Sequence, residues 1–277
     1  MNAIPARKTV SGNKRIQTNF FSFCRNSSRY KFLHLLRKWL RLRRRRKRAA
    51  KLGFEFKRAA GFQTPGQIQW KGKVFKLFFP DEVGTLNDFL SIFLDDDYYL
   101  ERQNKEVSSV LDIGANLGFF SIAARNAFPN ATIHSYEPNE DLKSYLDPHA
   151  KQACFEVHYE AVGREDGRVS LDIRGETNQT RSQVNDEGDV PQVAFSKTVE
   201  RLNGKVDLAK IDCEGAEWEF LGEKEAWQNI RFLAMEYHLW PGEKNHEDAH
   251  HALQALDFEV LSQIPIKDYG LIYGRRT

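Results

Sequence analysis

The chain has 277 residues, 41% of them hydrophobic, and a formal net charge of +3. That length and composition allow one sizeable core, so we expect one domain with an N-terminal extension. The three cysteines form no CxxC pair, which disfavours a structural zinc site and a disulfide framework. With no apolar run near the ~18 residues of a membrane span and no secretory signal pattern, we expect a cytoplasmic protein, soluble or peripheral at the inner membrane face.

The net charge conceals an asymmetry between the two ends of the chain. Residues 1–60 contain 19 Lys and Arg and a single acid, Glu55, out of totals of 41 bases and 38 acids. Residues 61–277 therefore contain 22 bases and 37 acids. A basic extension of +18 precedes a body of −15, and we expect the two parts to have different partners.

The extension divides into two stretches. Residues 1 to about 28 are polar and basic without apolar periodicity, and we expect them to be disordered. Residues 29–51 place leucines and aromatics near helical spacing among basic residues, which predicts a basic amphipathic helix. Such a helix suits an anionic membrane surface first; nucleic acid, a transit peptide and a merely solvated tail remain alternatives.

The body begins with a small N-terminal part, residues 61–104. Alternation over 67–79 predicts a hairpin that turns at Lys71-Gly72-Lys73, and a helix is expected over 86–99. From residue 105 onward, apolar strands are expected at about 107–113, 131–136, 154–162, 206–212, 230–237, 258–265 and 269–275. This alternation with helices predicts a mostly parallel Rossmann-like α/β sheet of seven strands. Because only Ile266-Lys267-Asp268 joins the last two strands, they must pair antiparallel.

The strongest motif is the run Val110-Leu111-Asp112-Ile113-Gly114-Ala115-Asn116-Leu117-Gly118, a strand that enters a glycine turn before a helix. Gly114 and Gly118 allow a ligand to approach the backbone, and Asn116 tolerates positive φ. The helix N-terminus that follows suits a carboxylate. The spacing is GxxxG rather than GxGxxG, which disfavours a dinucleotide.

Two further segments complete the predicted ligand site. Glu137 ends the next strand, 25 residues after Asp112, where an acid accepts hydrogen bonds from both hydroxyls of a ribose. By analogy with the fold, we expect adenine to lie near Glu160, Ala161 and Val162. The loop from Arg174 to Pro191 carries no readable pattern.

A third motif crowds acids after another strand. Asp212, Glu214 and Glu217 follow Val206–Ile211, and the strand that ends at Glu236-Tyr237-His238 supplies more polar groups. Candidate proton acceptors are Asp212, Glu214, Glu236 and His238, and we favour Asp212 because crowded carboxylates raise one another's pKa. Glu217 is equally explained as an acid that complements a helix dipole.

The segments DIGANLGFFS, YEP, KIDCEGAEWEFL and MEYH, in this order over roughly residues 70–275, resemble an FkbM-family methyltransferase. The resemblance implies a class I methyltransferase fold, S-adenosylmethionine as cofactor, and O-methylation of a sugar, glycan or other natural product. It places Asp112, Gly114, Asn116, Gly118 and Glu137 at the cofactor, and Asp212, Glu214 and Glu217 beside the substrate.

Several alternatives remain open. The acid cluster could bind a divalent cation, but no spacing requires one and we predict no metal. His246, His250 and His251 lack an HExxH pattern, so a solvated helix face is favoured. An RNA methyltransferase that uses the basic extension is disfavoured by the acidic body and by the absence of an Asn/Asp-Pro-Pro-aromatic loop. A non-catalytic docking protein with the same fold is disfavoured by the intact glycine turn.

Overall fold

The computed structural model describes residues 15–103, 106–173, 180–185, 187–239 and 243–277. The chain divides into two compact units, residues 1–45 and residues 46–277. No helix among the described residues is long and apolar enough to cross a membrane.

Helix α1, Arg15–Lys51, runs through the first unit and ends in the second. The expected disorder is therefore wrong for residues 15–28, while residues 1–14 lie outside the described part. Residues 13–52 contain neither Gly nor Pro, and their Ser and Asn residues cost a helix only tenths of a kcal/mol each, so nothing in the sequence stops the helix there.

The second unit begins with the predicted hairpin. Strands β1 (Gln67–Trp70) and β2 (Lys73–Lys76) pair antiparallel across Lys71 and Gly72, both at positive φ, as a two-residue hairpin turn requires. Helix α2 spans Val83–Phe89 and continues as a π-helical turn, η1 (Leu90–Asp95). The helix expected to reach residue 99 stops at Asp96, which is left-handed, because consecutive acids oppose the negative C-terminal end of a helix dipole.

The central sheet has seven strands in the order β12-β13-β11-β10-β3-β4-β5. Strand β13 lies between β11 and β12 and is antiparallel to both, whereas β11, β10, β3, β4 and β5 pair parallel in turn. The predicted Rossmann-like sheet with an antiparallel last strand is confirmed. The strands are β3 (Ser109–Ile113), β4 (Thr132–Tyr136), β5 (Glu156–His158), β10 (Val206–Ile211), β11 (Ile230–His238), β12 (Phe258–Pro265) and β13 (Tyr269–Arg276).

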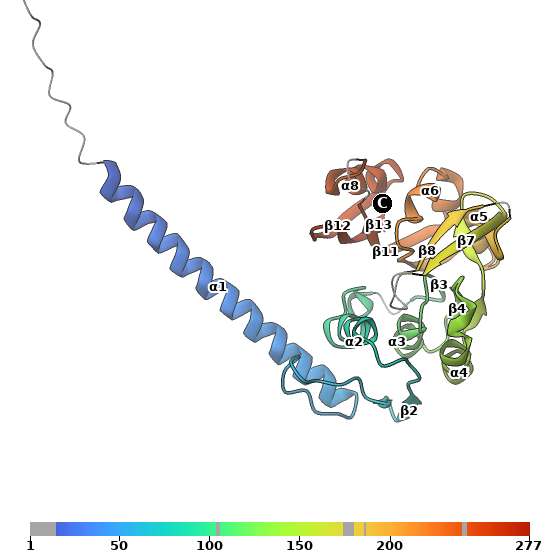
Figure 1. Ribbon diagram of the computed structural model, residues 1–277, viewed down its shortest axis with the longest axis horizontal. Coiled ribbons are helices and arrows are strands. Elements are labelled where there is room, and N and C mark those ends of the chain that lie inside the picture. Colours follow the sequence, from blue (N-terminus) through green and yellow to red (C-terminus); the bar gives the residue numbers. More distant parts are fainter. Residues whose placement is uncertain (1–14, 104–105, 174–179, 186, 240–242) are drawn as a thin grey trace, which may run out of the picture. The chain divides into compact units, whose positions relative to one another are not determined.

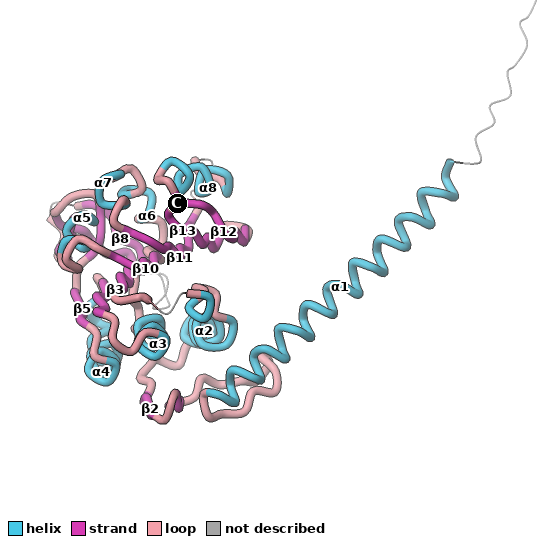
Figure 2. The backbone as a smooth tube through the Cα atoms, turned by 180° about the vertical axis from the view of Figure 1, so that it is seen from behind, coloured by secondary structure: helices cyan, strands magenta, loops and turns pink. Residues whose placement is uncertain are grey.

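Helices cover both faces of this sheet (Figures 1 and 2). On one face lie α2, α3 (Phe119–Ala127) and α4 (Lys143–Ala153). On the other lie α5 (Phe195–Glu200), α6 (Glu217–Phe220), α7 (Lys224–Trp227) and α8 (His246–Ala255). Short 3-10 turns occur at η2 (Leu100–Arg102) and η3 (Glu140–Leu142).

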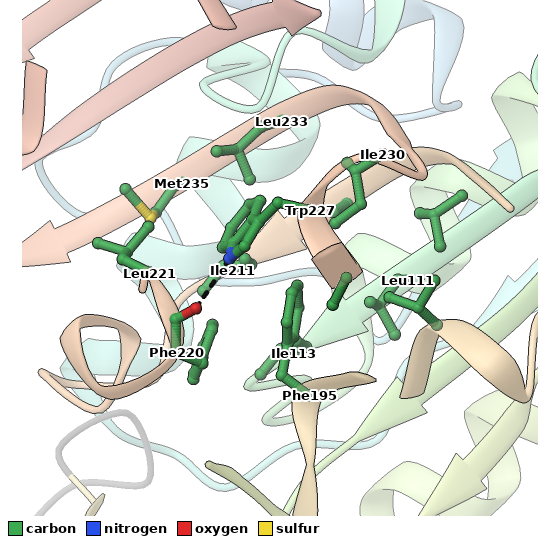
Figure 3. Packing of buried hydrophobic residues seen from close by; sticks show 14 of the residues in the cluster. Leu111, Ile113, Phe195, Ile211, Phe220, Leu221, Trp227, Ile230, Leu233 and Met235 are labelled. Carbon is green, nitrogen blue, oxygen red and sulfur yellow. Dashed lines mark hydrogen bonds between the residues drawn. The ribbon is translucent and has the colours of Figure 1, made fainter. Parts of the chain in front are cut away.

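The main core lies between the sheet and the helices α5 to α8. The fully buried Trp227 packs among Ile230, Leu233 and Phe195, and its Nε1 donates to the carbonyl of Phe220 at 2.8 Å (Figure 3). A buried indole N–H needs such an acceptor. This packing fixes β10 and β11, whose carboxyl ends carry the acidic residues.

A second sheet, in the order β6-β9-β7-β8, corrects two expectations. The single strand expected over 154–162 is divided into β5 and β6 (Ala161–Gly163), because β5 pairs with β4 whereas β6 pairs with β9 in the other sheet. The stretch without a readable pattern contains β8 (Thr180–Val184) and the start of β9 (Val190–Ala194), and β7 is Gly167–Ile173.

Candidate active site

The glycine turn joins β3 to α3 and has the backbone that the sequence predicts. Gly114 and Gly118 both have φ of +74°, and Asn116 has φ of +48°. No side chain caps the N-terminus of α3, so its first turn is left for an anionic group. The turn therefore has the shape of a ligand-binding loop.

The two glycines have a second role, which the sequence did not indicate. A Cβ on Gly114 would lie 1.7 Å from the carbonyl oxygen of Asp212, and a Cβ on Gly118 would lie 2.7 Å from Leu146 Cδ1. Both glycines thus permit close contact within the protein itself. At Gly114 this contact brings the turn against the acidic loop after β10.

Asp112 lies beneath the turn and is completely buried. Its Oδ2 accepts a hydrogen bond from Ser121 Oγ at 2.7 Å, and its Oδ1 lies 3.4 Å from Lys210 Nζ. Burial raises the pKa of Asp112, although Lys210 and Ser121 oppose the rise. These contacts give Asp112 a role in holding the turn, and direct contact with a cofactor stays a prediction.

Glu137 lies beside the turn at the end of β4. Its Oε2 accepts from the backbone N–H of Asn116 at 2.7 Å and its Oε1 from that of Asn139 at 2.9 Å. Burial raises its pKa to about 7 despite these hydrogen bonds. A carboxylate has about four acceptor positions, so two remain for hydroxyl donors such as those of a ribose.

Asn116 also fits a ligand. Its side-chain N–H group donates to Asp88 Oδ2 at 2.9 Å, whereas its buried Oδ1 has no hydrogen-bond partner. A buried unpaired acceptor is costly unless a ligand completes it. Together, the turn, Glu137 and Asn116 offer acceptors for the ribose and amino groups of a nucleoside-containing cofactor.

The residues predicted near adenine lie where the chain passes from β5 in the central sheet to β6 in the second sheet. Ala161 is buried in β6, and Glu160 forms an ion pair with Arg201, whose Nη2 donates to its Oε1 at 3.2 Å. Arg201 also lies over the ring of Tyr136, 5.8 Å from its centroid. Contact of Glu160 or Ala161 with adenine stays a prediction.

The acids expected beside the substrate gather at the ends of β10 and β11. His238 Nε2 lies 3.5 Å from Glu214 Oε2 and 3.7 Å from Glu236 Oε1, and Asp212 joins the group. Burial, Asp212 and Glu214 raise the pKa of Glu236 well above its ordinary value, so the effect expected from crowded carboxylates is present at Glu236.

His238 is held as a cation by this group. Burial alone would lower its pKa, but the contact with Glu217 and the charges of Asp212 and Glu214 outweigh burial and raise it to about 9. Glu217 is completely buried and accepts from the backbone N–H groups of Gly215 and His238 at 2.8 and 2.5 Å. Glu217 therefore fixes the two loops to each other.

Sequence reasoning missed two residues of this site. Tyr98, in the segment between η1 and η2, donates its hydroxyl hydrogen to Asp212 Oδ2 at 3.0 Å. Lys210 Nζ donates to the carbonyls of Gly114 and Ile113 at 2.5 and 3.3 Å and lies 3.9 Å from Asp212 Oδ2. A lysine near the end of the largely apolar strand Val206–Ile211 was a usable signal for Lys210, but nothing local marked Tyr98.

Two groups in the described part of the chain have ligand atoms close enough together to bind one metal ion, within 4.8 Å of one another. One is Asp212, Glu214 and His238, and the other is His134, Glu156 and His158. The histidines of α8 contact protein groups instead: His246 Nδ1 lies 2.9 Å from the hydroxyl of Tyr237, and His250 Nδ1 lies 3.1 Å from Gln263 Oε1.

Comparison with known proteins points to one family. The family model described as the methyltransferase FkbM domain matches residues 112–270, more than half of the chain. No curated protein matches.

Three solved structures illustrate a similar fold at low sequence identity. The precorrin-6Y C5,15-methyltransferase of Geobacter metallireducens is 13% identical, with a TM-score of 0.40 over 66% of this chain and 87% of that one. The N-terminal domain of EvdMO1, solved with SAH bound, is 12% identical, with a TM-score of 0.41 over 66% and 80% of the two chains. A SAM-dependent methyltransferase of Aquifex aeolicus is 13% identical, with a TM-score of 0.39 over 72% and 100%.

Proposed function

Since this chain belongs to the methyltransferase FkbM family, we propose that it methylates a hydroxyl group of a sugar, glycan or other small natural product. The family makes it a methyltransferase with S-adenosylmethionine as cofactor. The residues around the glycine turn fit that cofactor, because Glu137 and Asn116 retain buried acceptors for its hydroxyl and amino groups. The bound cofactor supplies an already activated methyl group.

The observation that carries the choice of acceptor is the acidic group beside the turn. Asp212, Glu214 and Glu236 are each about a quarter exposed, and they face the same region as His238. Carboxylates accept hydrogen bonds from hydroxyls but repel phosphates, so this group of acids favours a polyhydroxylated acceptor over RNA.

Asp212 is the proposed proton acceptor. Its carbonyl contacts Gly114, which places it next to the cofactor turn, and Tyr98 holds its Oδ2, so its other oxygen is left to bind the acceptor hydroxyl. His238 stays protonated up to about pH 9 and cannot accept a further proton at neutral pH. We therefore assign His238 and Glu214 to orienting the substrate.

The test is methyl transfer to a panel of sugars, nucleotide sugars and lipid-linked glycans, with products identified by mass spectrometry. Replacing Asp212 by Asn keeps the shape of the side chain and an oxygen for Tyr98 but removes the base, so kcat should fall roughly 10²- to 10⁴-fold. Cofactor affinity, measured by calorimetry, should stay within about twofold.

Three results would count against this proposal. Undiminished kcat in Asp212→Asn would exclude Asp212 as the proton acceptor. Transfer to RNA but to no hydroxylated small molecule would replace the acceptor class. Failure of folded wild-type protein to bind S-adenosylmethionine would remove the enzymatic proposal altogether.

A further inference from the structure

Helix α1 carries an apolar stripe that faces solvent. Large apolar side chains follow the spacing i, i+3, i+4, i+7 and i+8, which places them along one side of an α-helix. Their exposed fractions range from 38% to 65%, which is unusual for so many neighbouring large side chains. The stripe consists of Phe32, Leu35, Leu36, Trp39 and Leu40, with Leu33 at its edge, 47% exposed.

The opposite side of the same helix is basic. Arg37, Lys38 and Arg41 lie opposite the stripe, and residues 43–48 follow it as an uninterrupted run of Arg and Lys that extends around all sides of the helix. The described part of α1 contains no acid at all. Arg43 lies over the indole of Trp39, 5.4 Å from the ring centroid, so cation and aromatic ring are adjacent at the end of the stripe.

From this arrangement we propose that α1 lies in the surface of a membrane that contains anionic lipids, with the stripe among the acyl chains and the basic residues at the headgroups. An apolar stripe and a high positive charge on one helix are the two features that such binding needs. The stripe from Phe32 to Leu40 is about 13 Å long, less than half of a bilayer's hydrocarbon thickness, so the helix lies along the surface and does not span it.

Two other occupants suit the helix less well. Nucleic acid would pair with the arginines but would leave the stripe in water. A second copy of the helix would cover the stripe only by bringing together two strongly basic helices that contain no acid. A lipid surface can contact the apolar stripe and the basic residues at the same time.

The experiment is co-flotation of the full-length protein with vesicles of phosphatidylcholine alone or mixed with phosphatidylglycerol, at about 0.1 M and about 1 M salt. Wild type should bind the mixed vesicles, and high salt should weaken binding. Leu35→Glu/Trp39→Glu should lower the partition coefficient at least tenfold, about 1.4 kcal/mol.

The matched control is Val74→Glu/Val184→Glu, which adds the same two charges at side chains that are 52% and 64% exposed on the body. Its partition coefficient should stay within about twofold of wild type. Because vesicle binding is measured without substrate, failure here and failure of the proposed methyl transfer are separate results.

Five outcomes would overturn the proposal. In the first, the wild type does not bind mixed vesicles. In the second, the control loses as much vesicle binding as Leu35→Glu/Trp39→Glu, and in the third, Leu35→Glu/Trp39→Glu loses none. The fourth is a stable dimer, seen by light scattering, that the same double variant dissociates. Tighter binding to single-stranded RNA than to mixed vesicles at equal salt would assign the helix to nucleic acid instead.

Discussion

Glu137 is surrounded by hydrogen-bond donors and is nevertheless costly to ionise. Its two oxygens accept from the backbone of Asn116 and Asn139, yet it is only 5% exposed and its pKa is raised to about 7. Without ligand the fold therefore favours the protonated acid below that pH. A buried acceptor that is incompletely satisfied is typical of a site that a ligand completes.

Glu137→Gln should remove a pH-dependent part of the stability. The folded chain holds the proton of Glu137 up to about pH 7, while the unfolded chain releases it near 4.5, so the folded state binds more protons between these values. Wild-type stability should therefore decrease as pH rises through this window, by on the order of 3 kcal/mol from this group. Urea unfolding of the cofactor-free proteins at about pH 5 and about pH 8 measures this.

The control for this change is Glu140→Gln, in which the replaced acid is exposed and paired with Lys143. It should follow the wild-type pH dependence. If Glu137→Gln also ran parallel to wild type over the whole range, the raised pKa of Glu137 would be refuted.

At single positions, the sequence predicted residues whose role is local. Gly114, Asn116 and Glu137 could be recognised because a strand, a turn and a helix follow one another along the chain. Tyr98 could not, since its contact with Asp212 joins residues 114 positions apart through a left-handed turn at Tyr99 that no pattern predicts. The close packing at Gly114 could not be predicted either, because the carbonyl oxygen of Asp212 that it approaches belongs to a loop far away in the sequence.

The element that most depends on close packing is the turn between β3 and α3. Gly114 and Gly72 have nearly the same φ, +74° and +78°. They differ in surroundings, since a Cβ on Gly72 meets nothing within 4 Å and one on Gly114 would overlap the carbonyl of Asp212. This pair separates the cost of left-handed backbone from the cost of a clash.

Gly72→Ala should destabilise the protein by only about 1 to 2 kcal/mol, the cost of a left-handed alanine. Gly114→Ala should cost at least about 3 kcal/mol and weaken binding of S-adenosylmethionine at least tenfold, because the turn and the Asp212 loop must separate. Urea unfolding and calorimetry on both variants test this. Equal costs in the two would show that the loops do not touch at Gly114.

Among the elements, those with strong periodicity were predicted and those defined by pairing partners were not. The strands of the central sheet follow from their apolar runs, and the hairpin follows from Lys71-Gly72. The break between β5 and β6 was missed, because both halves suit a strand and only the choice of β4 or β9 as neighbour separates them. The second sheet as a whole was missed for this reason.

For the molecule as a whole, charge and structure divide the chain at similar places. The basic excess lies in residues 1–60, and the boundary between the two compact units lies at Arg45–Arg46. Arg48, just past that boundary, is 9% exposed, donates to the carbonyl of Leu94 and pairs with Asp96 and Glu101. The last turns of α1 therefore belong to the fold of the body, and the positions before them carry the exposed stripe.

A chain that begins at Arg46 should keep the body intact and lose membrane binding. Residues 32–41 are exposed throughout, so their removal exposes little apolar surface, while Arg48 and its partners remain. The melting temperature should change by no more than about 2 to 4 °C, and the affinity for S-adenosylmethionine by no more than about twofold. Partitioning into phosphatidylglycerol vesicles should fall to the level of vesicles without anionic lipid. A shortened chain that unfolds or loses the cofactor would instead show that residues 1–45 support the body, and that the stripe is covered by protein in the working molecule.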